Sequence, residues 1–187
     1  MNVVIKELEN DSRQIRDVQE FLFSMIKKEF GYGYIPKWHQ DIVDMTKFYI
    51  SPKRNNFFVA YSQKTGEIMA TIGLRSYDKD FPEFRDLYSK DLTSSIWRLF
   101  VNEKYRRCGL ASKMFNIAEN FANDEGYKDI YLHTHKTLDG ALEFWTKMGF
   151  VTVLDAKDEL QTVHMDKKIQ KLDIAPQTID FKHAIKL

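Results

Sequence analysis

Apolar residues recur at steps of three and four along two long stretches of the chain, which is the spacing of amphipathic helices. The first helix is predicted from Asp11 or Ser12, either of which can cap it, to Phe30. The second is predicted from Leu110 to about Glu125, before Gly126. Further helices are expected over residues 38–49 and 139–148. Each should cover one face of a core.

Extended apolar segments fill the intervals between these helices. They are expected at residues 3–8, 57–61, 68–74, 96–101, 129–134, 150–154 and 160–165. The composition of residues 63–67 is typical of a hairpin, so the strands on either side of it should pair antiparallel. This order predicts a mixed α/β sheet covered by helices, not a doubly wound dinucleotide fold. The charged and aromatic insertion 78–92 is compatible with a loop or with a short helix.

Size and charge restrict the class of protein. The chain has 187 residues, of which 43% are hydrophobic, and this suits a single domain over residues 1–168 with an unassigned tail at 169–187. A formal net charge of +1 provides no general field for nucleic acid. No run approaches the ~20 apolar residues of a membrane span, and the N-terminus lacks the apolar stretch of a secretion signal. We therefore expect a cytoplasmic protein, monomeric or homodimeric, without nucleic-acid or membrane partners.

A basic turn with one glycine lies between a predicted strand and a predicted helix. It consists of Arg106, Arg107, Cys108, Gly109, Leu110 and Ala111. A helix that opens there presents unpaired backbone N–H groups and the positive end of its dipole to an anion. The expected anion is a pyrophosphate, bound by the amides of Cys108, Gly109, Leu110, Ala111 and Ser112, with charge-assisted contacts from Arg106 or Arg107.

Two segments together resemble the GNAT superfamily of N-acetyltransferases. Leu99, Phe100 and Val101, followed by Arg106-x-x-Gly109-x-Ala111, resemble its acyl-coenzyme A signature, and residues 141–150 resemble the end of its next helix and the start of the following strand. The resemblance implies a mixed, mostly antiparallel sheet of about seven strands, with splayed central strands and about four flanking helices. It also implies acetyl-CoA as cosubstrate and a primary amine as acceptor.

The same resemblance implies how the cosubstrate is held. The strand through Leu99 and Val101 would pair with the pantetheine amides, and a backbone N–H near Phe100 or Val101 would meet the thioester carbonyl. Trp145 stands where many members of the superfamily carry a tyrosine near the leaving thiolate. Because an indole cannot usefully donate a proton, the acid of the reaction is not identified.

The base is also missing from its usual strand, because residues 94–98 contain neither a carboxylate nor a histidine. His133 is the first candidate, on the same strand face as His135, since its imidazole titrates near neutrality. A water chain and a purely structural role for His133 stay open. Other possible proton acceptors are acidic: Glu29, Asp80, Glu83 and Asp91.

The remaining conspicuous residues receive structural interpretations or open alternatives. Residues 38–41 (Trp-His-Gln-Asp) are interpreted as a helix start, so no metal is predicted. Cys108 is interpreted as a small turn residue, not a nucleophile. The aromatic residues of two irregular segments either line an acceptor pocket or anchor loops; they are Tyr32, Tyr34, Phe81, Phe84 and Tyr88.

The sequence thus predicts an N-acetyltransferase that uses acetyl-CoA by direct attack in a ternary complex. The alternatives are a non-catalytic coenzyme A binding module or sensor, and an interaction protein that keeps the fold without the ligand. The acceptor could be a small-molecule or a protein amine. Acidic residues in the insertion favour a cationic one.

Overall fold

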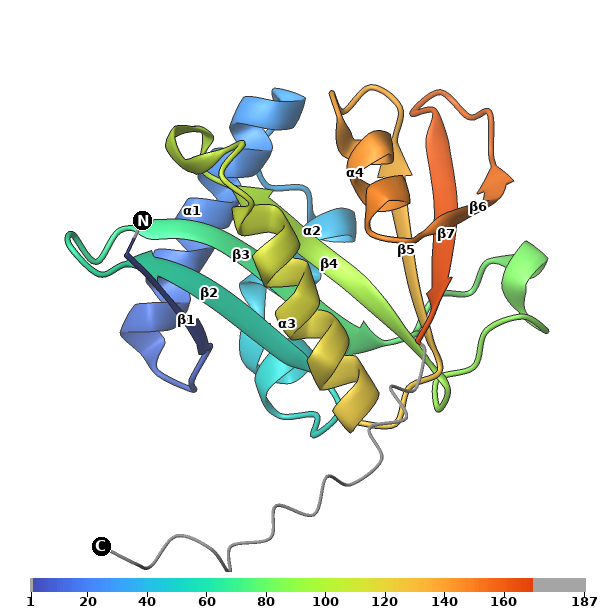
Figure 1. Cartoon of the computed structure of the whole chain (residues 1–187), viewed down its shortest axis with the longest axis horizontal. Coiled ribbons are helices and arrows are strands. Elements are labelled where there is room, and N and C mark those ends of the chain that lie inside the picture. Colours follow the sequence, from blue (N-terminus) through green and yellow to red (C-terminus); the bar gives the residue numbers. More distant parts are fainter. Residues whose placement is uncertain (1, 170–187) are drawn as a thin grey trace, which may run out of the picture.

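A seven-stranded sheet forms the middle layer of the protein in a computed structural model that describes residues 2–169 (Figure 1). The strands, in chain order, are β1 (Val3–Glu7), β2 (Asn56–Ser62), β3 (Ile68–Ser76), β4 (Thr93–Val101), β5 (Asp129–His135), β6 (Val151–Asp155) and β7 (Thr162–Lys168). Their order across the sheet is β1-β2-β3-β4-β5-β7-β6. All neighbours pair antiparallel except β4 and β5, which are parallel. The predicted mixed, mostly antiparallel sheet is confirmed.

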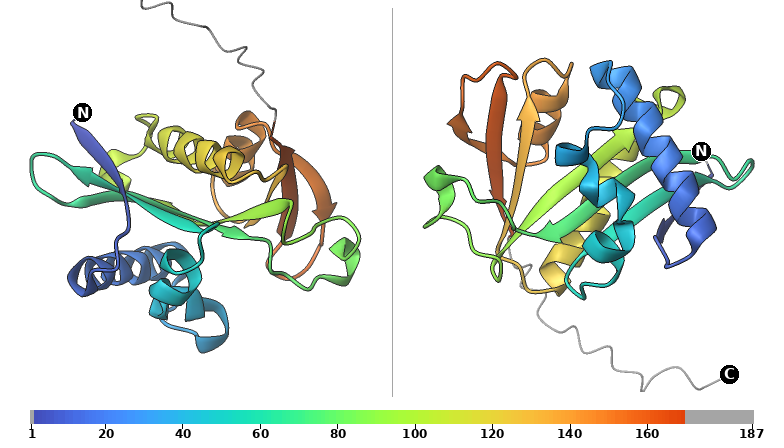
Figure 2. Two further views of the ribbon diagram at one scale, coloured as in Figure 1. Left: turned by 90° about the horizontal axis from the view of Figure 1, so that it is seen from below. Right: turned by 180° about the vertical axis from the view of Figure 1, so that it is seen from behind.

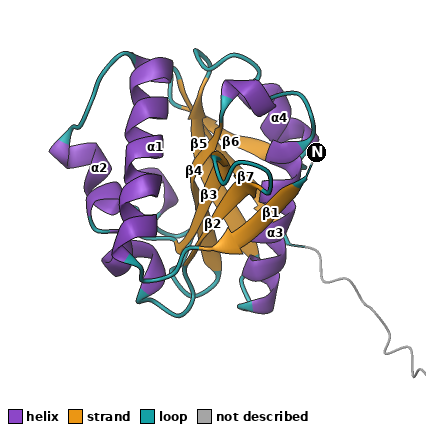
Figure 3. Cartoon of the chain, turned by 90° about the vertical axis from the view of Figure 1, so that its left-hand side faces the viewer, coloured by secondary structure: helices purple, strands orange, loops and turns teal. Residues whose placement is uncertain are grey.

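Helices cover both faces of this sheet, as Figures 2 and 3 show. One face carries α1 (Ser12–Phe30), α2 (Pro36–Val43) and a π-helical turn (Thr46–Ile50). The other carries α3 (Leu110–Asp124) and α4 (Ala141–Lys147). Two short 3₁₀ turns, Pro82–Phe84 and Glu103–Tyr105, complete the helical segments of the described residues. Within residues 2–169, no helix has both the length and the apolar character needed to cross a membrane.

The first predicted helix has the predicted ends. The Asp11 carboxylate accepts hydrogen bonds from the amides of Arg13 and Gln14, at 3.0 and 2.8 Å, and so caps two free donors. Gly31 ends the helix in the left-handed region, at φ 75°. Its apolar stripe consists of Ile15 and four residues that are buried: Val18, Leu22, Met25 and Ile26. The amphipathic pattern therefore located both the helix and its core face.

The helix predicted over residues 38–49 is wrong in its continuity. Asp44 leaves helical geometry, at φ −120° and ψ 65°, and separates α2 from the π-helical turn. Its carboxylate accepts a hydrogen bond from the amide of Lys47 at 3.1 Å, a local bond that competes with the helical one.

The insertion 78–92 contains one 3₁₀ turn and is otherwise irregular, so the short-helix alternative holds only for that turn. The buried rings of Phe84 and Tyr88 anchor it to β5. The unassigned tail at 169–187 lies outside the described residues apart from Ile169.

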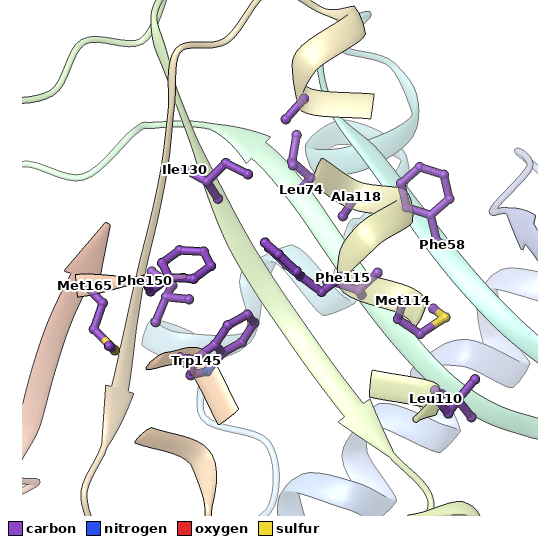
Figure 4. Close-up of a cluster of buried hydrophobic side chains, with 14 of the residues drawn as sticks. Phe58, Leu74, Leu110, Met114, Phe115, Ala118, Ile130, Trp145, Phe150 and Met165 are labelled. Atoms are coloured by element: carbon purple, nitrogen blue, oxygen red, sulfur yellow. The ribbon is translucent and has the colours of Figure 1, made fainter. Parts of the chain in front are cut away.

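Two principal cores lie on opposite faces of the sheet. The core between the sheet and α3 and α4 contains Trp145, whose indole packs against the rings of Phe115 and Phe150 (Figure 4). The core under α1 and α2 contains Leu22, Ile42 and Tyr49 among its fully buried side chains. The sheet thus separates a face closed by α3 and α4 from a face closed by α1 and α2, and the candidate site lies where the sheet itself opens.

Candidate active site at the split between β4 and β5

The sheet opens between its two parallel strands. β4 and β5 pair only at Thr93–Ser95 with Asp129–Tyr131, and beyond that point the strands diverge (Figure 1). Continuing the register places Trp97 opposite His133, two residues beyond the last pair on each strand. The splayed central strands predicted from the sequence are present. Backbone groups of β4 after Ser95 consequently have no partner strand on that side.

A β-bulge in β4 changes which side chains face α2. Trp97 is opposite Gly73 and Phe100 is opposite Thr71, so two residues of β4, Arg98 and Leu99, stand across from a single residue of β3. Arg98 adopts φ 49°, and its carbonyl accepts from the Thr71 hydroxyl at 2.9 Å. As a result, the consecutive side chains of Trp97 and Arg98 both contact groups on the α1–α2 side of the sheet.

Arg98 holds α2 against the split strand. Its guanidinium donates to both carboxylate oxygens of Asp41, from Nε at 2.9 Å and from a terminal nitrogen at 2.6 Å, and also to the carbonyl of Trp38 at 2.6 Å. The Tyr49 hydroxyl donates to the same carboxylate at 2.7 Å. Burial alone would raise the pKa of Asp41, but its hydrogen bonds and the Arg98 charge outweigh burial and lower it. We call Arg98, Asp41 and Tyr49 the α2 latch.

Trp97 has cations around its indole ring. Lys79 Nζ lies 3.7 Å from the ring centroid, and the guanidinium carbon of Arg75 lies 4.5 Å from it. Arg75 also forms an ion pair with Asp78. Partial burial lowers the pKa of Lys79 to about 8, and the neighbouring positive charge of Arg75 acts in the same direction. Lys79 therefore stays mostly protonated at neutral pH.

His133 lies across the split, on the α1–α2 side of β5. Its ring is 6.0 Å from that of His164 and 6.2 Å from that of His135, centroid to centroid, which confirms that His133 and His135 share a face. The side chain is open to solvent, and it makes no hydrogen bond with any of residues 2–169. Partial loss of hydration among its neighbours, followed by the charge of Lys79, lowers the pKa of His133. The imidazole, with its pKa lowered to about 3, is therefore neutral at pH 7 and is a weaker base than a free histidine.

The predicted phosphate turn forms where β4 ends and α3 begins. Gly109 is the N-cap residue, at φ 79°, and no side chain among the described residues caps the helix. The first helical bond runs from the amide of Lys113 to the carbonyl of Gly109, so the amides of Leu110, Ala111 and Ser112 precede it. A Cβ built on Gly109 meets nothing within 4 Å. The turn is open to a ligand, as an anion cradle requires.

The other predicted cofactor residues have varied surroundings. Arg106 pairs with Glu29 of α1 and donates to the carbonyl of Val101 at 3.1 Å, so it links the turn to the end of β4. Arg107 is exposed at φ 60°, and the Cys108 thiol donates to the carbonyl of Tyr105 at 2.7 Å. Trp145 is 7% exposed in the core. Its expected contact with the leaving thiolate stays a prediction.

Most of the alternative candidates have structural surroundings. Asp80 pairs with Arg85 at the surface, while Glu83 and Asp91 are exposed. In the predicted helix start at 38–41, Asp41 belongs to the latch, and His39 Nδ1 accepts from the amide of Ile35 at 2.9 Å. Among the aromatic residues, Phe84 and Tyr88 anchor the insertion, Tyr32 stacks near His39, and Tyr34 is 51% exposed.

Sequence reasoning missed the α2 latch and Lys79. The latch joins residues 57 positions apart, and it depends on a bulge that the strand pattern does not reveal. Lys79 stands in an insertion whose local structure had two open alternatives. The one available signal was that Trp97 and Arg98 follow a serine pair at the end of a buried strand segment.

A mixed sheet that opens between two parallel central strands, beside an uncapped helix at the end of one of them, defines the GNAT class of fold. Comparison with known families agrees, because residues 19–150 match the model described as the acetyltransferase (GNAT) family. The chain belongs to this family.

Known relatives and solved structures are consistent with this assignment. The chain is 36% identical to rat N-acetyltransferase 8 over 119 residues, which are 63% of this chain and 50% of the relative. It is 34% identical to mouse N-acetyltransferase 8 over 131 residues, which are 70% and 53% of the two chains. The chain thus spans about half the length of these curated relatives.

Among solved structures, a GNAT-family acetyltransferase from Staphylococcus aureus Mu50 superimposes with a TM-score of 0.70 at 19% identity, covering 89% of this chain and 100% of that one. A chain of the NatC complex, solved with Gag peptide and CoA, gives a TM-score of 0.67 at 20% identity and covers 91% and 100%. At these identities the structures establish the fold alone.

Proposed function

We propose that this protein transfers an acetyl group from acetyl-CoA to a primary amine, by direct attack in a ternary complex. The observation that supports it is the adjacency of two ligand-accepting features, the β4–β5 split and the open helix start at Gly109. The amides of residues 108–112 would hold the pyrophosphate, and the free edge of β4 at residues 99–101 would hold the pantetheine arm. The bound cosubstrate supplies an activated thioester.

The chain's own groups would then position the reactants and handle the proton. The amine nitrogen forms a bond to the thioester carbon, the carbon–sulfur bond breaks, and the thiolate leaves. An N–H of Phe100 or Val101 stabilises the developing oxyanion. His133, neutral at pH 7, takes the proton that the amine loses. A thiolate whose parent thiol has a pKa of about 8.5 can leave without an acid, so the core position of Trp145 is no obstacle.

The cosubstrate site is tested by Gly109→Val, with Gly66→Val as its matched control. Both glycines have positive φ, 79° and 73°, and open space at the Cβ position, so the backbone strain of the two substitutions is similar. Only Gly109 lies at the helix start. Calorimetry with coenzyme A should show binding to the wild type and to Gly66→Val, and loss of binding to Gly109→Val. Equal affinity in all three would refute the assignment.

Catalysis is tested by release of free thiol from acetyl-CoA in the presence of amines. A panel containing amino acids, amino acid amides, polyamines and a lysine peptide should contain at least one amine that accelerates release and is recovered acetylated. Binding of coenzyme A without acceleration by any amine would instead support the non-catalytic binding module.

A further inference from the structure

The charge at the mouth of the split differs from what the composition of the insertion indicates. Arg75 and Lys79 stand over the Trp97 indole, and the guanidinium of Arg98 lies 5.8 Å from its centroid. Arg75 is paired with Asp78, and Arg98 is paired with Asp41. Each arginine is therefore neutralised by a carboxylate of its own.

Lys79 is different. It forms no ion pair and no side-chain hydrogen bond with any of residues 2–169, and its nearest partner is the π face of Trp97 at 3.7 Å. Asp80, the other acid beside it in the chain, is paired with Arg85 at the surface. A partly buried ammonium group whose only partner is an indole face has donors left for an anion.

The position of this ammonium group relates it to the acceptor amine. Trp97 stands opposite His133 in the continued β4–β5 register. Burial, followed by the charge of Lys79, lowers the pKa of His133. Neighbouring strands lie about 5 Å apart and farther where they diverge, so Trp97 and His133 are on opposite sides of the split and are separated by at least one strand spacing. The imidazoles of His133 and His164 have lowered pKa values and carry no charge at pH 7.

From this arrangement we infer that the acceptor carries a carboxylate within a few bonds of its reactive amine, and that Lys79 binds this carboxylate while the amine faces His133. The inference rests on the proposed acetyl transfer and specifies its substrate class as amino acids or similar zwitterions. A polyamine would bring a second positive charge to Lys79 at close range and would be disfavoured.

The test compares each of several L-amino acids with its own amide, which has the same shape without the negative charge. The enzymes are the wild type, Lys79→Met, Lys79→Arg and, as control, Lys64→Met, whose lysine is exposed at the other end of β3. Melting temperatures establish that each variant is folded. Values of kcat/KM come from thiol release at pH 7.

The wild type should favour the acids, and Lys79→Met should lose about tenfold or more in kcat/KM for them while retaining its activity on the amides, as expected for one hydrogen bond to a charged group. Lys79→Arg should retain most of the preference, and Lys64→Met all of it. A wild type that favours amides or polyamines, or an unchanged preference in Lys79→Met, would overturn the inference while leaving acetyl transfer intact.

A binding measurement separates this inference from the proposed function. If no amine is acetylated, the proposed function fails, and calorimetry decides the role of Lys79 with N-acetyl-amino acids and their amides in the presence of coenzyme A. The site would be supported if the wild type bound the acids more tightly than the amides and Lys79→Met abolished this difference. Equal binding to both proteins, or no binding to either, would overturn it.

Discussion

Removing Arg98 should be among the most damaging single substitutions in the α1–α2 half of the protein. The side chain of Asp41 is 4% exposed, and two of the three hydrogen bonds from side chains to its carboxylate come from Arg98. Arg98→Leu would leave a buried carboxylate with the Tyr49 hydroxyl as its remaining side-chain donor. Breaking a buried ion pair costs about 3–5 kcal/mol. Because Arg98 is 15% exposed and water can enter in its place, we expect the lower end, about 3 kcal/mol.

A double-mutant cycle distinguishes a lost ion pair from lost packing. Asp41→Leu alone leaves the guanidinium without its carboxylate, whereas Asp41→Leu combined with Arg98→Leu leaves neither charge buried. The double variant should therefore be more stable than the sum of the two single losses predicts, with a coupling free energy of about 2 kcal/mol. Urea unfolding followed by tryptophan fluorescence measures all four proteins. Additive losses would show that the latch is not a coupled ion pair.

Acid titration provides a second check with a definite sign. The pKa of Asp41 is lowered in the folded protein, so the latch stabilises the fold at pH values above the pKa of this carboxyl group in the unfolded chain. This stability is lost as the pH falls through the lowered pKa of the folded protein. Without Arg98, burial dominates and the pKa of Asp41 should rise above its ordinary value. The stability deficit of Arg98→Leu should then shrink as the pH is lowered from 7 toward 5, because the buried acid becomes neutral. A deficit that is constant with pH would contradict the reasoning.

Three further predictions concern single positions. His133→Ala should remove a limb from the pH–rate profile of acetyl transfer without abolishing coenzyme A binding, and an unchanged profile would exclude it as the base. Preference for amino acids over their amides should fade as the pH rises through about 8, because Lys79 loses its charge there. Burial and the charges of Asp78, Arg75, Asp41 and Arg98 together set this pKa. A preference that is constant from pH 7 to 9.5 would count against a role for Lys79. Gly73→Ala should destabilise the fold by about 1–3 kcal/mol in urea unfolding, since its Cβ would lie 2.6 Å from Cε1 of Tyr49, whereas Gly33→Ala, with open space, should not.

The sequence predicted those parts of the fold in which local signals agree with one another. In α1, the apolar stripe, the Asp11 cap and the stop at Gly31 all indicate one helix with one set of ends. The segment after α2 contains a conflict, because apolar spacing continues while Asp44 offers the backbone a competing hydrogen bond. Periodicity reports only the apolar spacing, so the helix that it predicted was too long.

In the candidate site, too, local sequence signals located one part and missed another. The glycine turn was located because a strand, a glycine and a helix are contiguous in the chain, and their geometry follows from local rules. The α2 latch was not located from the sequence, because strand alternation predicts opposite directions for the side chains of Trp97 and Arg98. The bulge at Arg98 brings both to one side, and it forms through pairing with β3, about 27 residues earlier in the chain. Such register shifts belong to the tertiary structure.

Ion pairing explains why the composition of the insertion and its structure favour different acceptors. The acids of the insertion favoured a cationic acceptor when they were counted as free charges. Asp78 and Asp80 are instead paired with Arg75 and Arg85, while Lys79 between them contacts the Trp97 indole and has no acidic partner at salt-bridge distance among residues 2–169. A substrate at the split responds to the charge left after such pairing, at distances shorter than the screening length of about 8 Å. The proposed carboxylate of the acceptor would therefore meet the positive charge of Lys79.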